Sequence, residues 1–427
     1  MSELGGRLMV GLCPLKASIL VRVQAPQLRP ESKPRSQVEI GYFARDILIF
    51  IKNMDTPRYE YSRSKIQDRI EYLKNLSAPY GLIVRYAVKA NPHKEIVGLM
   101  NNANINFDAS SSYEAEELLS QGISGTKISL SSQQSPHNID QLLDAGVLFV
   151  ATSIKQLELF LEAKNHPKTV GVRVNPNIGS GHNNRTSTGG VNASFGIWYE
   201  YLNDVKELAK SNNVIIDRIH LHVGSGSDPS VWDEIIDRAL LIVENLKDVI
   251  SLDIGGGFKV HRFGNEKETN MTEIFEVFTN KLVSFYGKTG RKLKLEIEPG
   301  TYFVAHAGTL IASVDDIVDT GSNGYTFLKL NTGMNDFLRT AMYGANHVIE
   351  VMNKSENIKR YIVVGHNCES GDIFTTISGN SEEIEPRILK EARIGDEIRI
   401  YDTGAYCASM RVKSYNSFPD AIEVVVD

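Results

Sequence analysis

The chain has 427 residues, of which 42% are hydrophobic, and is too long for one ordinary core, so we expect two domains. A formal net charge of -6 argues against nucleic acid as a main partner, and no apolar run is long enough to span a membrane. Three scattered cysteines argue against a disulfide framework or a zinc site, so we expect no metal and a reducing, cytoplasmic compartment.

The N-terminal segment, residues 1–36, is expected to be irregular, because Pro26, Pro30 and Pro34 break any regular pattern. It is basic and acid-poor, which weakly resembles an organelle-targeting leader, although short basic tails are common. Residues 37–54 carry apolar residues at mixed spacing and predict a strand segment that joins a β domain. Residues 59–76 have apolar residues near helical spacing and predict an amphipathic helix.

From residue 82 onwards, a unit of short apolar strand, turn and helix recurs. Eight strands are predicted, at residues 82–88, 105–108, 127–130, 147–151, 169–174, 217–223, 250–254 and 293–297. Helical patterns lie between them, at residues 112–121, 153–163, 230–246 and 272–286. Alternating strands and helices indicate a parallel sheet, and eight such units indicate an α/β protein with a closed TIM-type (β/α)8 barrel over residues 55–300. An open doubly wound sheet is the alternative.

Beyond residue 300 the helical periodicity fades. β-rich runs follow at residues 309–318, 325–330, 360–364, 397–402 and 421–426, some of them separated by turn signals such as GSNG at 321–324. This pattern predicts a second, C-terminal all-β domain over residues 301–427.

Lys89 stands at the end of the first apolar barrel strand, which is an unusual place for a surface charge. A buried lysine has a lowered pKa, and its neutral amine can attack a carbonyl group. The competing interpretation is a strand-end lysine that reaches out to water.

Other polar or small residues follow the predicted strands, at the barrel rim where active sites of this fold lie. They are residues 109–111, Ser131, Thr152, residues 173–175, His222, Gly224, Ser225, Gly255, Gly256, Gly257 and Glu298. Each alone has a structural explanation, but their joint placement on one rim predicts a site. The glycines could bind a phosphate, Glu298 could pair with a pyridinium nitrogen, and Lys89 could bond an aldehyde. Together these features describe pyridoxal 5'-phosphate (PLP).

Six motifs occur in the order found in the alanine-racemase-fold PLP decarboxylases, which the chain resembles. They are YAVKAN at 86–91, HLHVGS at 220–225, LDIGGGF at 252–258, EPG at 298–300, CESGD at 368–372 and GAY at 404–406. Within that group the chain is most similar to the diaminopimelate decarboxylases, over roughly residues 55–427. The resemblance implies decarboxylation of meso-diaminopimelate to L-lysine.

The resemblance also implies cofactor roles for the matching residues. Lys89 would hold the cofactor aldehyde, His222 would stack on the pyridine ring, and Glu298 would keep the ring nitrogen protonated. The phosphate would be bound by Ser225, Gly255, Gly256, Gly257 and Tyr406.

Further implied roles belong to the second domain. Cys368 would act as a general acid in the active site of a partner subunit, so a homodimer is implied. Glu369 would bind the distal ammonium of the substrate. Arg339 and Tyr343 would lie near its distal carboxylate, and Tyr406 would also contact the substrate.

Three positions depart from the family pattern. Thr301 stands where the family has arginine after EPG, Thr340 replaces a proline, and Phe418 stands where arginine is common. Threonine cannot replace the bidentate anion contact of a guanidinium, so recognition of the distal end of the substrate is open.

Two alternatives remain. The first is a decarboxylase of another diamino acid or an amino-acid conjugate in secondary metabolism; the CESGD motif argues against a plain ornithine decarboxylase, and the second-domain motifs argue against a racemase. The second is a non-catalytic homologue that binds a partner, against which the presence of both Lys89 and Cys368 argues.

Overall fold

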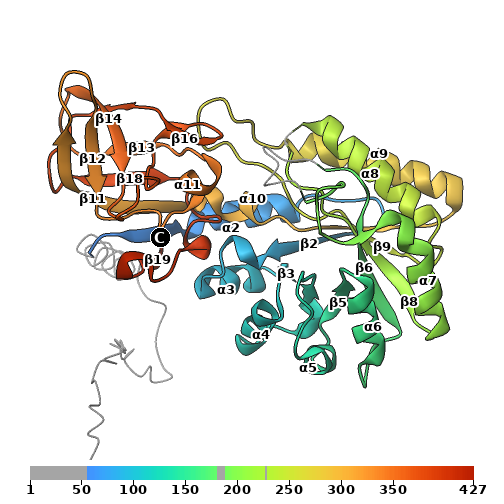
Figure 1. Ribbon diagram of the computed structural model, residues 1–427. Coiled ribbons are helices and arrows are strands. Elements are labelled where there is room, and N and C mark those ends of the chain that lie inside the picture. The colour runs from blue at the N-terminus through green and yellow to red at the C-terminus, as the bar shows by residue number, and fades with distance from the viewer. Residues whose placement is uncertain (1–54, 180–187, 227) are drawn as a thin grey trace, which may run out of the picture. The chain divides into compact units, whose positions relative to one another are not determined.

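The computed structural model describes residues 55–179, 188–226 and 228–427, and the segments predicted for residues 1–36 and 37–54 lie outside these ranges. Its central feature is a closed barrel of eight parallel strands (Figure 1). They are β2 (Leu82–Ala87), β3 (Asn106–Ala109), β4 (Ile128–Leu130), β5 (Leu148–Ala151), β6 (Thr169–Asn175), β8 (Ile215–His220), β9 (Ser251–Asp253) and β10 (Lys294–Ile297). The strands pair in chain order, and β10 pairs with β2, so the sheet closes on itself. The predicted barrel is confirmed and the open sheet is excluded.

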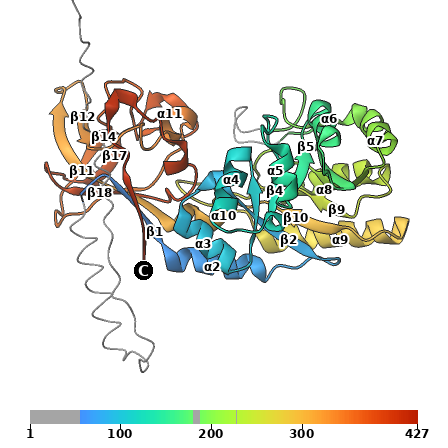
Figure 2. The ribbon, with the colours of Figure 1, turned by 90° about the horizontal axis from the view of Figure 1, so that it is seen from below.

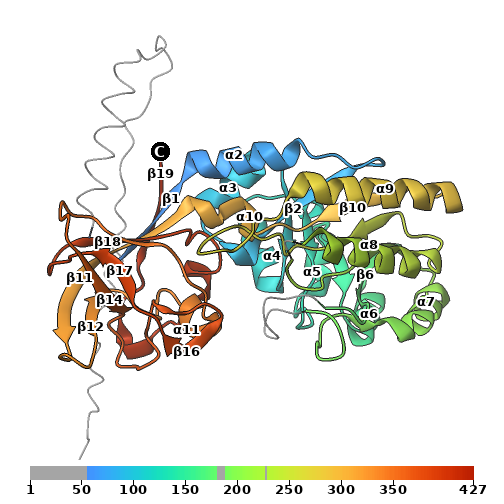
Figure 3. The same ribbon diagram turned by 90° about the horizontal axis from the view of Figure 1, so that it is seen from above.

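Helices connect the barrel strands and cover the outside of the barrel (Figure 3). They are α3 (Lys94–Asn102), α4 (Ser112–Ser120), α5 (Ile139–Asp144), α6 (Ile154–Glu162), α7 (Leu202–Ser211), α8 (Pro229–Glu244) and α9 (Met271–Thr289), with the short strand β7 (Ile197–Trp198) beside β6. Trp232 of α8 is buried, stacks on Phe258 at 4.5 Å between ring centroids, and donates to the carbonyl of Gly226 at 3.2 Å. This packing holds α8 against two rim loops. No helix in the described ranges combines the length and apolarity that crossing a membrane requires.

The helix predicted for residues 59–76 begins later than expected. Residues 58–62 form strand β1 (Arg58–Ser62), and α2 (Arg63–Lys74) starts after it with the Ser62 side chain as its N-cap. Tyr59 and Tyr61 are fully buried, and their ring centroids lie 6.1 Å apart. Side chains two residues apart share a face only in a strand, so tertiary packing overrides the helical pattern here.

A mostly antiparallel sheet follows the barrel in sequence. The short helix α10 (Thr301–Val304) leads into this sheet (Figure 2). The strands of the sheet are β11 (Gly308–Asp319), β12 (Thr326–Leu330), β13 (Ile349–Val351), β14 (Ile358–Val364), β17 (Arg387–Lys390), β18 (Glu397–Tyr401) and β19 (Ile422–Val426). Strand β1 pairs with β11 on one side and with β19 on the other. Helix α11 (Arg339–Tyr343) and the hairpin β15 (Thr376–Ile377) and β16 (Asn380–Ile384) are inserted between its strands. The predicted β domain is confirmed. Strands β13, β15, β16 and β17 were not predicted, because all four are short and β16 carries mostly polar residues.

The segment after β18 lies against the turn that follows β2. The Asn91 side chain donates to the carbonyl of Gly404 at 3.0 Å, and the Tyr406 N–H donates to the carbonyl of Ala90 at 2.8 Å. These bonds bring the second domain to the barrel rim beside Lys89.

Candidate active site

Lys89 lies in a 3₁₀ turn (Val88–Ala90) directly after β2, at the C-terminal rim of the barrel. Its Nζ donates to Asp108 Oδ2 at 3.1 Å and to Ser110 Oγ at 2.8 Å. The Lys89 side chain is 41% exposed, whereas Asp108 is 1% exposed, so the amine covers a buried carboxylate. Desolvation alone would lower the pKa of Lys89, but the Asp108 carboxylate raises it above the ordinary value. The expectation of a lowered pKa is therefore wrong for the free protein, in which Lys89 is a cation held by Asp108.

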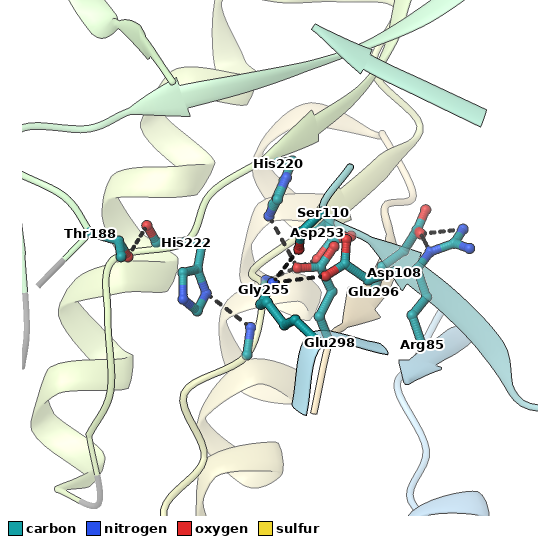
Figure 4. Close-up of polar contacts among 12 residues, drawn as sticks. Arg85, Asp108, Ser110, Thr188, His220, His222, Asp253, Gly255, Glu296 and Glu298 are labelled. Atoms are coloured by element: carbon teal, nitrogen blue, oxygen red, sulfur yellow. Dashed lines mark hydrogen bonds and ion pairs between the residues drawn. The ribbon is translucent and has the colours of Figure 1, made fainter. Parts of the chain in front are cut away.

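Polar side chains lie in two layers at this end of the barrel, and Figure 4 labels Glu296 of the lower layer and His220, Asp253 and Glu298 of the upper layer. Side chains two residues apart on a strand face the same side, so each of three strands contributes one residue to each layer. The pairs are Arg218 and His220 on β8, Ser251 and Asp253 on β9, and Glu296 on β10 with Glu298 directly after its end.

The lower layer is a fully paired ion cluster around Glu296. Both Arg85 Nε and Nη2 donate to Glu296 Oε2, at 2.8 and 2.7 Å, and Arg218 Nε donates to Oε1 at 2.9 Å. The hydroxyl of Ser251 also donates to Oε1. Burial would raise the pKa of Glu296, but the two guanidinium groups lower it to about 2. Glu296 is thus an anion that ties β2, β8 and β9 to β10 beneath the site.

Replacing Arg85 by leucine is expected to lower the free energy of unfolding by about 3–5 kcal/mol, because Glu296 would stay buried with one guanidinium fewer. The matched control is Lys288→Ala, which removes an exposed pair with Glu244 and should cost at most about 1 kcal/mol. Chemical denaturation at fixed protein concentration measures both. Equal losses in the two variants would contradict the structural role of Arg85.

The side chains of the upper layer differ from the Glu296 cluster in their protonation. His220 Nε2 lies 3.3 Å from Glu298 Oε2, while Glu298 Oε1 has no hydrogen-bond partner within the residues that the structure describes. Burial, with repulsion from Asp108, raises the pKa of Glu298 to about 8. Burial also raises the pKa of Asp253, and it lowers that of His220 to about 4. Both carboxyl groups therefore hold a proton more tightly than an ordinary carboxyl group does, and they lie beside a neutral histidine.

The raised pKa of Glu298 predicts a pH dependence of stability in the cofactor-free protein. A carboxyl group whose pKa folding raises contributes its full stability below its ordinary pKa of 4.5 and loses that contribution as the pH rises through about 8. The unfolding temperature should therefore fall relative to that of Glu298→Gln between about pH 5 and pH 8. Parallel curves for the two proteins would contradict the raised pKa.

His220 was missed as a site residue, because the strand predicted for residues 217–223 ran past it. Strand β8 ends at His220, and His222 lies beyond the strand. The Nδ1 of His222 accepts the Gly256 N–H at 3.1 Å, and burial lowers the pKa of His222, so its ring is neutral with the proton on Nε2. The sequence could have indicated His220 through its spacing from His222, because residues two apart in an extended segment point to the same side.

The rim loops after β8 and β9 approach each other so closely that only glycine fits. A Cβ at Gly257 (φ +103°) would lie 1.9 Å from the carbonyl oxygen of Gly224, and one at Gly256 would lie 2.3 Å from that of Glu298. The Gly226 N–H donates to Gly257 O at 3.1 Å, which joins the Ser225 segment to the glycine triplet. Of the three glycines only Gly257 is half-buried rather than buried, and backbone of this kind suits an oxyanion such as phosphate.

These groups fit PLP. Lys89 offers an amine for the aldehyde, the unpartnered Glu298 Oε1 offers a protonatable oxygen for the pyridine nitrogen, and Gly257 offers backbone to the phosphate, whereas the Gly256 N–H is bonded to His222. The ligand atoms of His220, Asp253 and Glu298 also lie within 4.8 Å of one another, the spacing of a metal site. The donor set as a whole matches PLP better, because Lys89 holds a positive charge beside the cluster.

The second domain contributes Tyr406 and Arg339 to this end of the barrel. Burial raises the pKa of Tyr406, and the charges of Lys89 and Arg339 act against that rise, so both cations lie near the phenol. Arg339 and Tyr343 begin and end α11, which places them on one helix face. The Arg339 Nε has no hydrogen-bond partner within the described ranges.

Cys368 and Glu369 lie on a loop that Asp372 organises. The Asp372 carboxylate accepts the N–H groups of Met334 and Asn367 at 2.7 and 2.8 Å. Cys368 is exposed, and its N–H donates to Asn416 Oδ1 at 2.7 Å.

The Glu369 carboxylate accepts from Tyr415 at 3.1 Å and from the Gly371 N–H at 3.2 Å, and these bonds lower its pKa. Next to this loop, Phe418 stacks on His366, with 3.6 Å between ring centroids. In the described part of the chain, no hydrogen bond or ion pair joins Cys368 or Glu369 to Lys89. The structure thus brings Lys89, Glu298 and Tyr406 together and leaves the Cys368 loop facing outward.

Comparisons with known proteins agree with this geometry. The family model described as "Pyridoxal-dependent decarboxylase, pyridoxal binding domain" matches residues 63–305. A diaminopimelate decarboxylase of Streptomyces coelicolor is 31% identical over 384 residues, which cover 87% of this chain and 84% of the relative. A crystal structure of a diaminopimelate decarboxylase superposes with a TM-score of 0.81 at 30% identity, covering 90% of this chain and 91% of the other. The Helicobacter pylori enzyme complexed with L-lysine has a TM-score of 0.79 at 28% identity, covering 89% and 94%.

Proposed function

The chain belongs to the diaminopimelate decarboxylases, a family of PLP-dependent carboxy-lyases, and we propose that it converts meso-diaminopimelate to L-lysine and carbon dioxide. The observation that carries the proposal is the arrangement of Lys89 over Asp108, with the unpartnered Glu298 Oε1 in the same barrel mouth. An amine, a carboxyl group with a raised pKa and a glycine-lined rim are the groups that a decarboxylase of this family needs.

When bound, PLP supplies the electron sink for the bond to the departing carboxylate. Asp108 and Ser110 orient the Lys89 amine toward the mouth and share its proton. Glu298 holds a proton at the end of the site that would receive the pyridine nitrogen. The neutral His220 and the Asp253 carboxyl group lie beside Glu298 and separate this proton from water. We assign His222 to the face of the cofactor ring, since its own ring is neutral and is held by the Gly256 N–H.

We also propose phosphate contacts from Ser225, Tyr406 and the backbone of residues 255–257. Arg339, Tyr343, Glu369 and Tyr406 are assigned to the substrate. In this assignment the barrel, within residues 55–300, binds the cofactor. The β domain, residues 301–427, supplies Tyr406, Arg339 and the Cys368 loop, and strand β1 belongs to its sheet.

We propose a homodimer with shared active sites, and the position of Cys368 supports this proposal. Its loop is bonded within its own domain, and its thiol is exposed, so it does not complete the site of its own subunit. A second copy can present Cys368 and Glu369 to the barrel mouth, where Cys368 returns a proton to the carbon that lost its carboxylate. We expect the enzyme to act in the cytoplasm, as the family's biosynthetic role suggests.

Growth of a bacterial strain that lacks its own diaminopimelate decarboxylase tests the proposed function. The gene for this chain should restore growth without added lysine, and a Lys89→Ala version expressed at the same level should not. Failure of the wild-type gene, with soluble PLP-loaded protein in the cells, would favour the alternative of another diamino acid as substrate.

A further inference from the structure

The loop after the glycine triplet carries a buried guanidinium to the rim. This loop is closed at its base by two bonds between Lys259 and Thr269, at 2.7 and 3.0 Å. The Arg262 N–H donates to Glu266 Oε2 at 3.0 Å, which fixes the turn independently of the Arg262 side chain. Phe263 lies under the guanidinium of Arg387 at 4.4 Å, so the loop reaches the β domain.

The guanidinium of Arg262 carries a positive charge and N–H donors that have no acceptor among the described residues. Its exposure is only 9%, yet its Nε and Nη2 have no hydrogen-bond partner among the described residues. The two carboxylates whose charges act on Arg262 bind other groups, since Glu266 accepts the Arg262 backbone N–H and Asp402 lies 2.6 Å from His306 Nδ1. A buried, unpaired guanidinium is costly, and proteins retain one where it meets an anion.

A second guanidinium, that of Arg339, lies close enough for its charge to act on Arg262. The charges of Arg262 and Arg339 act on each other and both act on Cys407, which follows Tyr406 in sequence. Burial, with repulsion from Arg339, lowers the pKa of Arg262 to about 9. Burial also keeps His347, which both cations approach, in the neutral form, so it adds no counter-charge. Two like charges with unpartnered donors, both acting on Cys407 next to Tyr406, define a site for one anionic group.

We propose that Arg262 and Arg339 together bind the second carboxylate of the substrate, and that Arg262 is the residue that selects a dicarboxylic diamino acid. The inference rests on the proposed function and extends it to a residue outside the family motifs. It also accounts for Thr301, which stands where the family has an arginine after the EPG motif. In this chain the guanidinium of Arg262, from the loop after β9, takes the place of that arginine after β10. The planar fork of arginine binds a carboxylate through two N–H groups, which threonine cannot do.

The test compares two ligands that differ by one carboxylate. L-lysine keeps the carboxylate in question, and cadaverine is lysine without it. Binding of each to PLP-loaded protein is measured by calorimetry for the wild type, Arg262→Gln, Arg262→Lys and the control Lys267→Gln, which removes an exposed cation from the same loop.

Arg262→Gln should weaken lysine binding about 30-fold and leave cadaverine binding within about 3-fold, because only lysine presents the carboxylate. Arg262→Lys should recover part of the loss, and Lys267→Gln should resemble the wild type. The KM for meso-diaminopimelate should rise by a similar factor in Arg262→Gln, with kcat little changed. The dissociation constant of PLP should not move.

Three results would overturn the inference. Lysine binding that survives Arg262→Gln would show that the carboxylate lies elsewhere. Equal losses for lysine and cadaverine would indicate a structural role for Arg262, and a loss of PLP affinity would indicate the cofactor phosphate as the anion. If the wild type neither binds lysine nor decarboxylates meso-diaminopimelate, the proposed function itself fails, and the inference fails with it.

Discussion

Lys89→Ala is expected to reduce turnover by about 10⁴-fold or more, because no other amine in the described barrel mouth can take its place as the covalent attachment point. The absorbance band of the bound cofactor should change as well. Steady-state rates and the absorption spectrum of the PLP-loaded protein measure the two effects.

Two further variants make the result specific to the amine. Lys89→Arg keeps the positive charge beside Asp108 but cannot bond an aldehyde, so it should be as inactive as Lys89→Ala. Ser110→Ala removes only the 2.8 Å hydrogen bond to Lys89 and should cost less than about 10-fold. Near-normal turnover by either Lys89 variant would refute the assignment.

Cys368→Ala is expected to lower kcat by about 10²–10⁴-fold, the range for loss of a general acid. The sharper result comes from mixing two inactive variants. In a heterodimer of Lys89→Ala with Cys368→Ala, one of the two shared sites has both residues intact. An equal mixture that exchanges subunits should therefore regain about a quarter of wild-type activity.

The mixture has its own control. Lys89→Ala mixed with Lys89→Arg has no intact site in any pairing and should remain inactive. No gain in the first mixture, with subunit exchange shown by mass spectrometry, would contradict the shared site and place Cys368 outside the chemistry.

The barrel could be predicted because its strands are buried on both faces and read as short apolar runs at regular intervals. The start of α2 could not, because Tyr59 and Tyr61 are a single pair two residues apart, which is too short a strand signal beside the helical spacing that follows it. Only their packing between β11 and β19 decides, and those partners lie more than 200 residues away in sequence.

The candidate site, like the fold, could be predicted from the sequence only in part. Lys89 and Glu298 could be predicted from their places at strand ends, as could the glycine triplet. The protonation of Lys89 could not, because it depends on Asp108 from the next strand. The role proposed for Arg262 could not be predicted from the residues around it in the sequence. It depends on Arg339, which the fold brings near Arg262 from the other domain.

Carbon dioxide release by purified, PLP-loaded protein tests the central claim most directly. The substrates to compare are meso-diaminopimelate, its LL isomer, D- and L-lysine, D- and L-ornithine and L-arginine. We predict rapid release from meso-diaminopimelate alone, with one L-lysine formed per carbon dioxide and none formed by Lys89→Ala. Silence with meso-diaminopimelate while the cofactor band is intact, or faster release from a monocarboxylic amino acid, would contradict the account.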